Sequence, residues 1–281
     1  MVKKDKELSI TGIDLAVEKD LKRAFDFQDA KVPSGFKDIE RLHIKPNHFK
    51  VSGDGVFYTL QGEGDSMGKP AVFLRLHLCN LRCYWCDAWY TWNLNTKEFW
   101  MESNNWSIKK TVQTIKKAWP VKNIHLQKRL VITGGEPLLQ KNTIDQLIDM
   151  LPDWYVEIET NGTIMPTDKM LKRCQFNCSP KLENSRNIKS LRIKSDVLDA
   201  LNKVNSVFKF VVMTEKDIDE IERDFVKPYK LDINKIIIMP QGVTSEEVSK
   251  NARRVVEKVK RKGYRLLGRL QCDIWGARRR V

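Results

Sequence analysis

The sequence contains no apolar run of about 18 residues or more, so no membrane-spanning helix is expected. Residues 1–10 are rich in lysine and lack the apolar core of a secretion signal. The 4 histidines show no metal-ligand spacing, and the 6 cysteines are too unevenly spaced to suggest a disulfide framework. A cytoplasmic location, where thiols remain reduced, is therefore expected.

Acidic residues are also fewer than basic ones: the sequence has 36 aspartates and glutamates against 50 lysines and arginines. An excess of this kind favours anionic ligands or nucleic acid as partners. The basic residues are spread over predicted helical faces and the tail 278–280, however, and no RNA-recognition signature accompanies them. We interpret the charge as a solvated surface, and nucleic acid is not expected as a partner.

Strand and helix patterns alternate from residue 51 onward, whereas residues 1–50 are polar, with one expected helix at 13–27. The sequence therefore predicts an N-terminal extension of unknown role at 1–50 and one domain at 51–281. Alternation of this kind implies parallel strands joined by right-handed crossovers. About six units are fewer than the eight of a closed barrel, so the α/β fold expected is a partial, open β/α barrel.

The expected elements can be given by their residue ranges. Strands are expected at 72–77, 130–133, 155–160, 175–179, 207–214, 235–239 and 264–271. Helices are expected at 143–151, 193–204 and 217–225, from a Ser107 cap to a stop before Pro120, and from a Thr244 cap to Gly263.

Three cysteines, Cys79, Cys83 and Cys86, lie within eight residues directly after the first of these strands. A structural zinc ion would need four ligands, and no fourth cysteine or histidine is close in sequence. Three thiolates suit a 4Fe–4S cluster that leaves one iron open for a substrate or cofactor. The remaining cysteines (Cys174, Cys178 and Cys272) are expected to be buried apolar residues.

Polar and glycine-rich turns follow the predicted parallel strands, where ligands bind in such folds. Gly134-Gly135-Glu136 follows the strand at 130–133, and its glycines allow close backbone approach. The carboxylate of Glu136 is a candidate acceptor for an ammonium group. Glu157 and Glu159 alternate with apolar residues, so both are expected on one interior face of their strand.

Together these motifs resemble the radical S-adenosylmethionine (SAM) superfamily, and their order resembles the 7-carboxy-7-deazaguanine synthase family. The narrower resemblance rests on motifs that appear in order over residues 51–281. They are Leu60-Gln61-Gly62-Glu63-Gly64, Phe73-Leu74-Arg75, Thr133-Gly134-Gly135-Glu136-Pro137, Glu159-Thr160-Asn161-Gly162, Ser179-Pro180-Lys181 and Trp275-Gly276.

The resemblance implies a radical SAM carbon–nitrogen lyase of 7-deazapurine (queuosine-type) biosynthesis. An electron donor such as flavodoxin or ferredoxin would reduce a 4Fe–4S cluster, and SAM would be cleaved to methionine and a 5′-deoxyadenosyl radical. The radical would take a hydrogen from 6-carboxy-5,6,7,8-tetrahydropterin. Ring contraction with loss of ammonia would then give 7-carboxy-7-deazaguanine. A homodimer is also implied by the family.

The resemblance assigns roles to individual residues, and none beyond the cluster and SAM is catalytic. The cluster ligands are Cys79, Cys83 and Cys86. The implied SAM contacts are Gly134, Gly135, Glu136, Ser179, Pro180, Lys181, Met239, Pro240 and Gln241. The implied substrate contacts are Leu60, Gln61, Gly62, Glu63, Arg75, Thr133, Glu159 and the C-terminal Val281. Arg75 is a planar cation suited to the pterin carboxylate, which agrees with this assignment.

Two positions depart from the family pattern. The family usually has a threonine or serine hydroxyl after the aspartate that follows the last cluster cysteine, and this hydroxyl ligates Mg²⁺. Here the stretch is Cys86-Asp87-Ala88, so Mg²⁺ would have to bind through substrate, water, Asp87 or another hydroxyl such as that of Thr91. A weaker magnesium requirement is expected. The second departure is Gln271, which stands where the family often has histidine.

Two other functions are compatible with parts of the sequence. Another radical SAM enzyme, such as a glycyl-radical activase, would use the same cysteine loop, but the Gln61–Gly64 segment and Arg75 favour a small carboxylated substrate. A non-enzymatic metal-binding nucleic-acid module would suit the basic charge, but a fourth metal ligand is missing.

Overall fold

The computed structural model describes residues 33–35, 43–123 and 125–279, and within them a single nine-stranded sheet runs through the molecule. The strand order is β3-β1-β2-β4-β5-β6-β7-β8-β9. The seven strands from β2 to β9 are parallel to their neighbours, whereas β1 is antiparallel to β2 and β3. The strands are β1 (His48–Leu60), β2 (Pro70–Leu76), β3 (Ser103–Ser107), β4 (Arg129–Gly134), β5 (Tyr155–Thr160), β6 (Cys174–Cys178), β7 (Ser206–Val212), β8 (Ile236–Pro240) and β9 (Arg265–Leu266).

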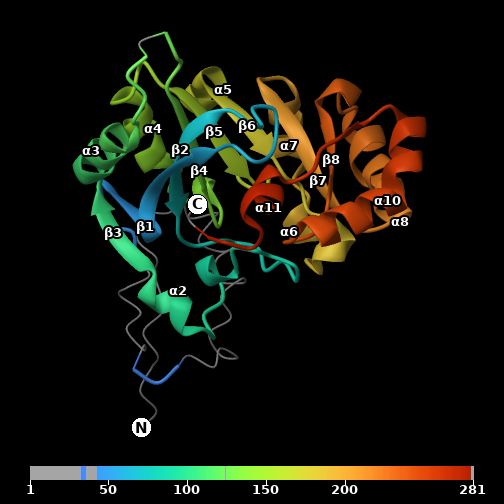
Figure 1. Ribbon diagram of the computed structural model, residues 1–281, viewed down its shortest axis with the longest axis horizontal. Helices are drawn as coiled ribbons and strands as arrows, with labels where there is room; N and C mark the ends of the chain where they lie inside the picture. The colour runs from blue at the N-terminus through green and yellow to red at the C-terminus, as the bar shows by residue number, and fades with distance from the viewer. Residues whose placement is uncertain (1–32, 36–42, 124, 280–281) are drawn as a thin grey trace.

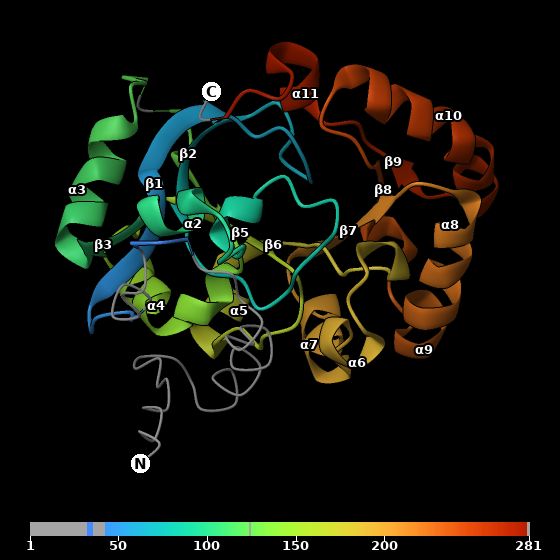
Figure 2. The same cartoon turned by 90° about the horizontal axis from the view of Figure 1, so that it is seen from below.

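Helices cover the outer face of this curved sheet, while the long loop after β2 lies across the end that faces the viewer in Figure 2. Figure 1 shows α11 beside the same end. The expected open, partial barrel is thus confirmed. The helices are α2 (Lys97–Met101), α3 (Ile108–Ala118), α4 (Lys141–Asp149), α5 (Asp168–Arg173), α6 (Lys189–Arg192), α7 (Ser195–Asn202), α8 (Glu215–Ile221), α9 (Lys227–Tyr229), α10 (Ser245–Lys262) and α11 (Leu270–Trp275).

The ends of two helices follow from capping chemistry that is visible in the sequence. Ser107 accepts a hydrogen bond from the backbone N–H of Lys110, which begins α3 as expected. Thr244 does the same for α10 by accepting from the N–H of Glu247. Gly263 ends α10 with a φ of 72°, which only glycine adopts without strain.

The core lies mainly between the sheet and the outer helices, because parallel strands bury both faces. All residues of β7 and β8 are buried. The inner face carries polar residues instead, among them Glu157 and Lys209. Cys174, Cys178 and Cys272 are buried, as expected for small apolar residues. No helix in the part of the chain that the structure describes is long and apolar enough to cross a membrane.

One expectation about a strand was wrong, and two strands were not expected. The strand expected at 264–271 is only the two-residue β9, and α11 begins at Leu270. Leu267 donates the last backbone hydrogen bond to β8, after which Arg269 turns into the interior to meet two carboxylates.

The two strands that were missed are the five-residue β3 and the longer β1, which has 13 residues. β1 was missed because its pattern is irregular. Its pairing with β2 shifts register between Val51 and Val56, where Gly53 and Gly55 have positive φ, so the sequence lacks the usual alternation. β1 begins at His48, three residues before the boundary expected at residue 51. The helix expected at 13–27 lies outside the described residues.

Candidate active site

A cavity of about 590 Å³ opens at the carboxyl ends of the parallel strands. It brings together most of the residues that the sequence singled out. Lining it are Leu60, Gln61, Gly62, Glu63, Arg75, Cys79, Cys83, Cys86, Thr133, Gly134, Gly135, Glu159, Ser179, Lys181, Met239, Pro240 and Gln241. Glu136 and Pro180 lie outside its wall, and Val281 lies outside the described residues.

The three cysteines of the loop after β2 share one wall of this cavity. Burial raises the pKa of all three thiols, that of Cys86 to about 12. Asn187 donates from Nδ2 to the sulfur of Cys83 at 3.3 Å, a contact that favours a thiolate. The donor set of three thiols, with a half-buried amide that donates to one of them, fits a 4Fe–4S cluster.

The cysteine loop differs from a site for a single metal ion. Within the ranges that the structure describes, no three cysteine, histidine, aspartate or glutamate side chains are arranged to hold one metal ion. A 4Fe–4S cluster requires another arrangement, because each thiolate binds a different iron atom.

The glycine turn after β4 packs directly against the start of the cysteine loop. Gly135 donates from its N–H to the carbonyl of Leu76 at 3.1 Å, and Glu136 donates to that of Leu78 at 2.8 Å. A Cβ atom at Gly134 or Gly135 would collide with these same carbonyl groups. The close backbone approach expected from the sequence is therefore confirmed, and it leaves backbone groups of the turn at the cavity wall.

The Glu136 side chain does not reach the cavity. Its Oε1 accepts from the N–H of Leu138 at 3.0 Å and the hydroxyl of Thr160 at 2.9 Å, and its Oε2 accepts from the N–H of Asn161 at 2.7 Å. Burial outweighs these bonds and raises its pKa to about 7. The carboxylate thus connects the end of β4 to the end of β5 and holds the glycine turn in place. Its oxygens are directed at these donors and not at the cavity.

Polar groups at the ends of β6 and β8 line the side of the cavity next to the cysteines. Lys181 donates to the hydroxyl of Ser179 at 2.8 Å, and its ammonium lies 5.6 Å from the Trp85 ring centroid. The carbonyl of Gln241 accepts from the Asn251 amide at 2.7 Å, which anchors the turn after β8.

A network of charged side chains occupies the other side of the cavity. Lys209 on β7 donates to Glu63 at 2.5 Å and to Glu159 at 2.9 Å. Arg269 and Gln271 both donate to the second oxygen of Glu63, at 2.8 and 2.6 Å. Burial by itself would raise the pKa of Glu63, but the nearby charges of Lys209 and Arg269 lower it well below its usual value.

A second layer of polar groups lies behind this network. The Gln61 amide donates to Glu159 at 3.0 Å, and the Asn177 amide does so at the same distance. Both amides also reach Glu157, which pairs with Arg129 and is fully buried. The expectation that Glu157 and Glu159 share an interior face is confirmed, and their charge is compensated by cations and amide donors.

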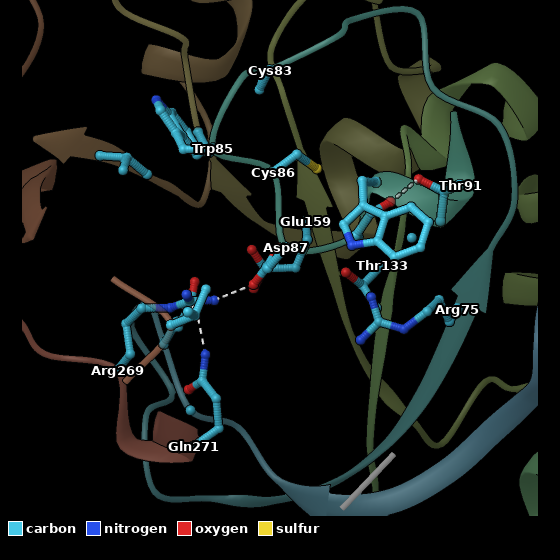
Figure 3. Close-up of a pocket in the computed structure, with 18 of the residues that line it drawn as sticks. Arg75, Cys83, Trp85, Cys86, Asp87, Thr91, Thr133, Glu159, Arg269 and Gln271 are labelled. Carbon is cyan, nitrogen blue, oxygen red and sulfur yellow. Dashed lines mark hydrogen bonds and ion pairs between the residues drawn. The ribbon is translucent and has the colours of Figure 1, made fainter. Parts of the chain in front are cut away.

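Arg75 extends into the cavity beside Thr133 (Figure 3). Its guanidinium lies 5.7 Å from the Phe57 ring centroid, and Phe57 stacks on Phe73 at 5.3 Å. No carboxylate among the described residues forms an ion pair with Arg75. This side of the cavity therefore offers an aromatic surface next to a cation that is available for an anionic ligand.

Several lining residues were missed from the sequence, chiefly Lys209, Arg269, Phe57 and Phe73. Lys209 had a usable signal, since it is the lone charge in the apolar run Val207–Val212. Arg269 had none, because it was placed within an expected strand. Gln271 was noted as a departure, and the structure places it in the cavity wall (Figure 3).

Comparison with known proteins agrees with this geometry. The Radical SAM superfamily pattern matches residues 75–178. A protein of Pyrobaculum aerophilum named 7-carboxy-7-deazaguanine synthase is 34% identical over 226 residues, which are 79% of this chain and 93% of that protein. A protein of the same name from Halobacterium salinarum is 30% identical over 247 residues, 78% of this chain and 88% of that protein.

A solved structure supports the fold independently. The crystal structure of QueE from Escherichia coli aligns with a TM-score of 0.56 and 23% identity over 79% of this chain and 94% of that one. One cavity is lined by the cysteine loop, the glycine turn and the strand-end residues. The arrangement of the site therefore agrees with the sequence similarity to these proteins. The chain belongs to the 7-carboxy-7-deazaguanine synthase family of the radical SAM superfamily.

Proposed function

We propose that this enzyme converts 6-carboxy-5,6,7,8-tetrahydropterin to 7-carboxy-7-deazaguanine with loss of ammonia. One observation supports the proposal above the others. A single cavity joins three thiols at cluster spacing to a cation without a carboxylate partner, Arg75, and to a fixed carboxylate, Glu159. The first set suits radical initiation, and the second suits a small carboxylated heterocycle.

Cys79, Cys83 and Cys86 would hold the cluster, and the adjacent strand-end groups would hold SAM. When bound, these cofactors supply the one-electron chemistry that starts the reaction. The backbone of Gly134–Gly135 offers polar groups without side-chain obstruction, and Lys181 offers a cation for a carboxylate. The role of the chain is to orient both molecules and to exclude water from the cavity.

On the substrate side, Arg75 would bind the pterin carboxylate, because a guanidinium matches a carboxylate in geometry. The ring would pack against the stacked pair Phe57 and Phe73. Glu159 would accept from the amino edge of the ring. Its position is fixed by Lys209 and by two amides, so it need not reorganise when the substrate arrives.

The electron donor is proposed to be an acidic carrier protein such as a flavodoxin or ferredoxin, docking outside the cysteine loop. Tyr84 and Ile188 are 67% and 63% exposed there, and the Arg186 guanidinium lies 3.6 Å from the Tyr84 ring centroid. Asn187, between Arg186 and Ile188, bonds to the sulfur of Cys83. Residues 184–194 contain four cations and no acid. Lys189 and Arg192 are paired with Asp224 and Glu220, so the exposed Arg186 would chiefly steer an acidic partner toward the cluster.

Further properties follow from family membership and are proposed on that basis. They are a homodimer, a cytoplasmic location and a catalytic domain that begins near residue 51, with residues 1–50 as an extension. Light scattering of the purified protein tests the first, because a monomeric mass at micromolar concentration contradicts it.

The function is tested by an anaerobic assay with SAM, a low-potential reductant and the carboxypterin, with Cys83→Ala as the control. We expect about four irons per chain, SAM cleavage and a deazaguanine product, all lost together in the control. SAM cleavage without deazaguanine would favour another radical SAM reaction, such as activation of a glycyl-radical enzyme. A protein that binds neither iron nor SAM after reconstitution would contradict the proposal.

A further inference from the structure

The stretch after the last cluster cysteine does not fit the magnesium site that the family resemblance implies. Ala88 has no side-chain oxygen, and it is buried. The hydroxyl of Thr91, the alternative expected from the sequence, is also buried and donates to the carbonyl of Ala88 at 2.7 Å (Figure 3). Ala88 thus offers no oxygen beside Asp87, and the Thr91 hydroxyl is held by its hydrogen bond to the Ala88 carbonyl, so only its lone pairs could face a cation.

A protein cation lies at Asp87 instead. Arg269 donates from Nη2 to the Asp87 carboxylate at 2.5 Å, from Nε to Glu63 at 2.8 Å and from Nη1 to the Gly242 carbonyl at 2.6 Å. The Arg269 side chain is only 13% exposed. One guanidinium thus joins the cysteine loop, the turn after β1 and the turn after β8, and each of its three nitrogens donates to one of them.

The charges around this point also leave no place for a second cation. Arg269 and Lys209 together face three carboxylates, those of Asp87, Glu63 and Glu159. Arg75 adds a third positive charge on the opposite side of the cavity, so these three carboxylates already face three cations before substrate binds, and Lys181 adds another positive charge to the wall. A divalent ion at Asp87 would lie against the Arg269 guanidinium and would be repelled by it.

We propose that this site works without a divalent cation, because Arg269 neutralises and positions Asp87 where the family resemblance places Mg²⁺, and the substrate carboxylate is bound by Arg75. The inference rests on the proposed function for the identity of the substrate. Arg269 is a positioning residue, since it acts on the ligand through Asp87 and Glu63.

Binding of Mn²⁺, used in place of Mg²⁺ and followed by electron paramagnetic resonance, tests this without turnover. Cluster-loaded wild-type protein with SAM and the carboxypterin is compared with two variants, Ala88→Thr and the double variant Ala88→Thr/Arg269→Gln. We expect wild type to leave Mn²⁺ free at millimolar concentration. The double variant should bind it at least about tenfold more tightly, because it gains a hydroxyl and loses the competing cation.

Turnover provides the second measurement. Wild-type kcat and KM should change less than about twofold between a chelator and millimolar Mg²⁺. Arg269→Gln should raise the KM for the pterin at least about tenfold, and Arg269→Lys should recover part of this loss because charge but not geometry is restored. Arg265→Gln is the matched control, since Arg265 forms an exposed ion pair with Asp65 at 3.1 Å. The control should leave KM unchanged.

Tight Mn²⁺ binding by wild type, or loss of its turnover in chelator, would overturn the inference. If Arg269→Gln fails to fold, the wild-type Mn²⁺ measurement decides alone. If the carboxypterin is not turned over under any condition, the proposed function fails. The comparison of Mn²⁺ binding in SAM-bound Ala88→Thr and in the double variant Ala88→Thr/Arg269→Gln still decides whether Arg269 excludes a divalent cation.

Discussion

Replacing Lys209 with methionine removes the cation that pairs with both Glu63 and Glu159 in the cavity. Lys209 is 4% exposed, Glu63 15% and Glu159 16%, so solvent screens these charges poorly. Removing one partner of a buried ion pair costs about 3–5 kcal/mol. Glu63 keeps Arg269, and Glu159 keeps two amide donors, so we expect the lower end, about 3 kcal/mol in the free energy of unfolding.

The loss should depend on pH with a definite sign. In wild type the pKa of Glu63 is lowered and that of Lys209 is raised, so this network contributes stability from about pH 5 to pH 10 without change. In Lys209→Met the burial of Glu63 is no longer offset by the Lys209 charge, so the pKa of Glu63 should rise above its usual value. Its charged form destabilises the fold, so stability should fall as pH rises from about 5 to about 8.

Anaerobic urea unfolding followed by tryptophan fluorescence, at about pH 5 and about pH 8, measures this difference. The double variant Lys209→Met/Glu159→Gln removes one uncompensated charge and should recover most of the loss. Lys128→Met is the matched control, because the Lys128–Asp153 pair is exposed and should cost less than about 0.5 kcal/mol. An equal loss at both pH values, or no loss in Lys209→Met, would refute the electrostatic account.

Three further predictions concern the edges of the site. Gly135→Ala should abolish SAM cleavage while retaining the fold, because the added Cβ would collide with the Leu78 carbonyl and displace the glycine turn from the cavity wall. A variant that cleaves SAM at the wild-type rate would contradict this. Arg186→Glu should slow cluster reduction by an acidic carrier about tenfold at low salt but not reduction by dithionite, and equal effects would argue against docking there. Glu102→Gln weakens the ion pair in which Arg279 donates to both oxygens of Glu102 and which holds Arg279 at the cavity. The KM for the pterin should rise roughly two- to fivefold, and an unchanged KM would show that this contact is not needed.

Local chemistry explains what could be predicted from the sequence. The spacing of Cys79, Cys83 and Cys86 identified the cluster loop because three ligands within eight residues need no tertiary information. The caps at Ser107 and Thr244 placed two helix starts for the same reason. The position of Gly135 was informative because a strand-end glycine marks a close backbone approach, which the structure contains.

Predictions failed where an isolated stretch was ambiguous. β1 contains Gly53 and Gly55 at a register shift, and its polar residues conceal the period of two. The run from Tyr264 resembles a strand, yet only Arg265 and Leu266 pair with β8. Glu136 has a side chain suited to binding an ammonium group, but its oxygens accept from the N–H groups of Leu138 and Asn161 and from the hydroxyl of Thr160.

The sequence alone determined that the chain forms an α/β fold with a three-cysteine loop and ligand-binding turns after its strands, because these depend on residue type and short spacing. Only the tertiary structure decided which charges meet. Glu63 and Arg269 are 206 positions apart, and Lys209 lies 146 positions from Glu63. Their contact depends on strand order and register, which bring the turns after β1 and β9 to one end of the sheet. Since ion pairing falls off with distance and solvent exposure, Arg269 could be placed beside Asp87 only after the fold was known.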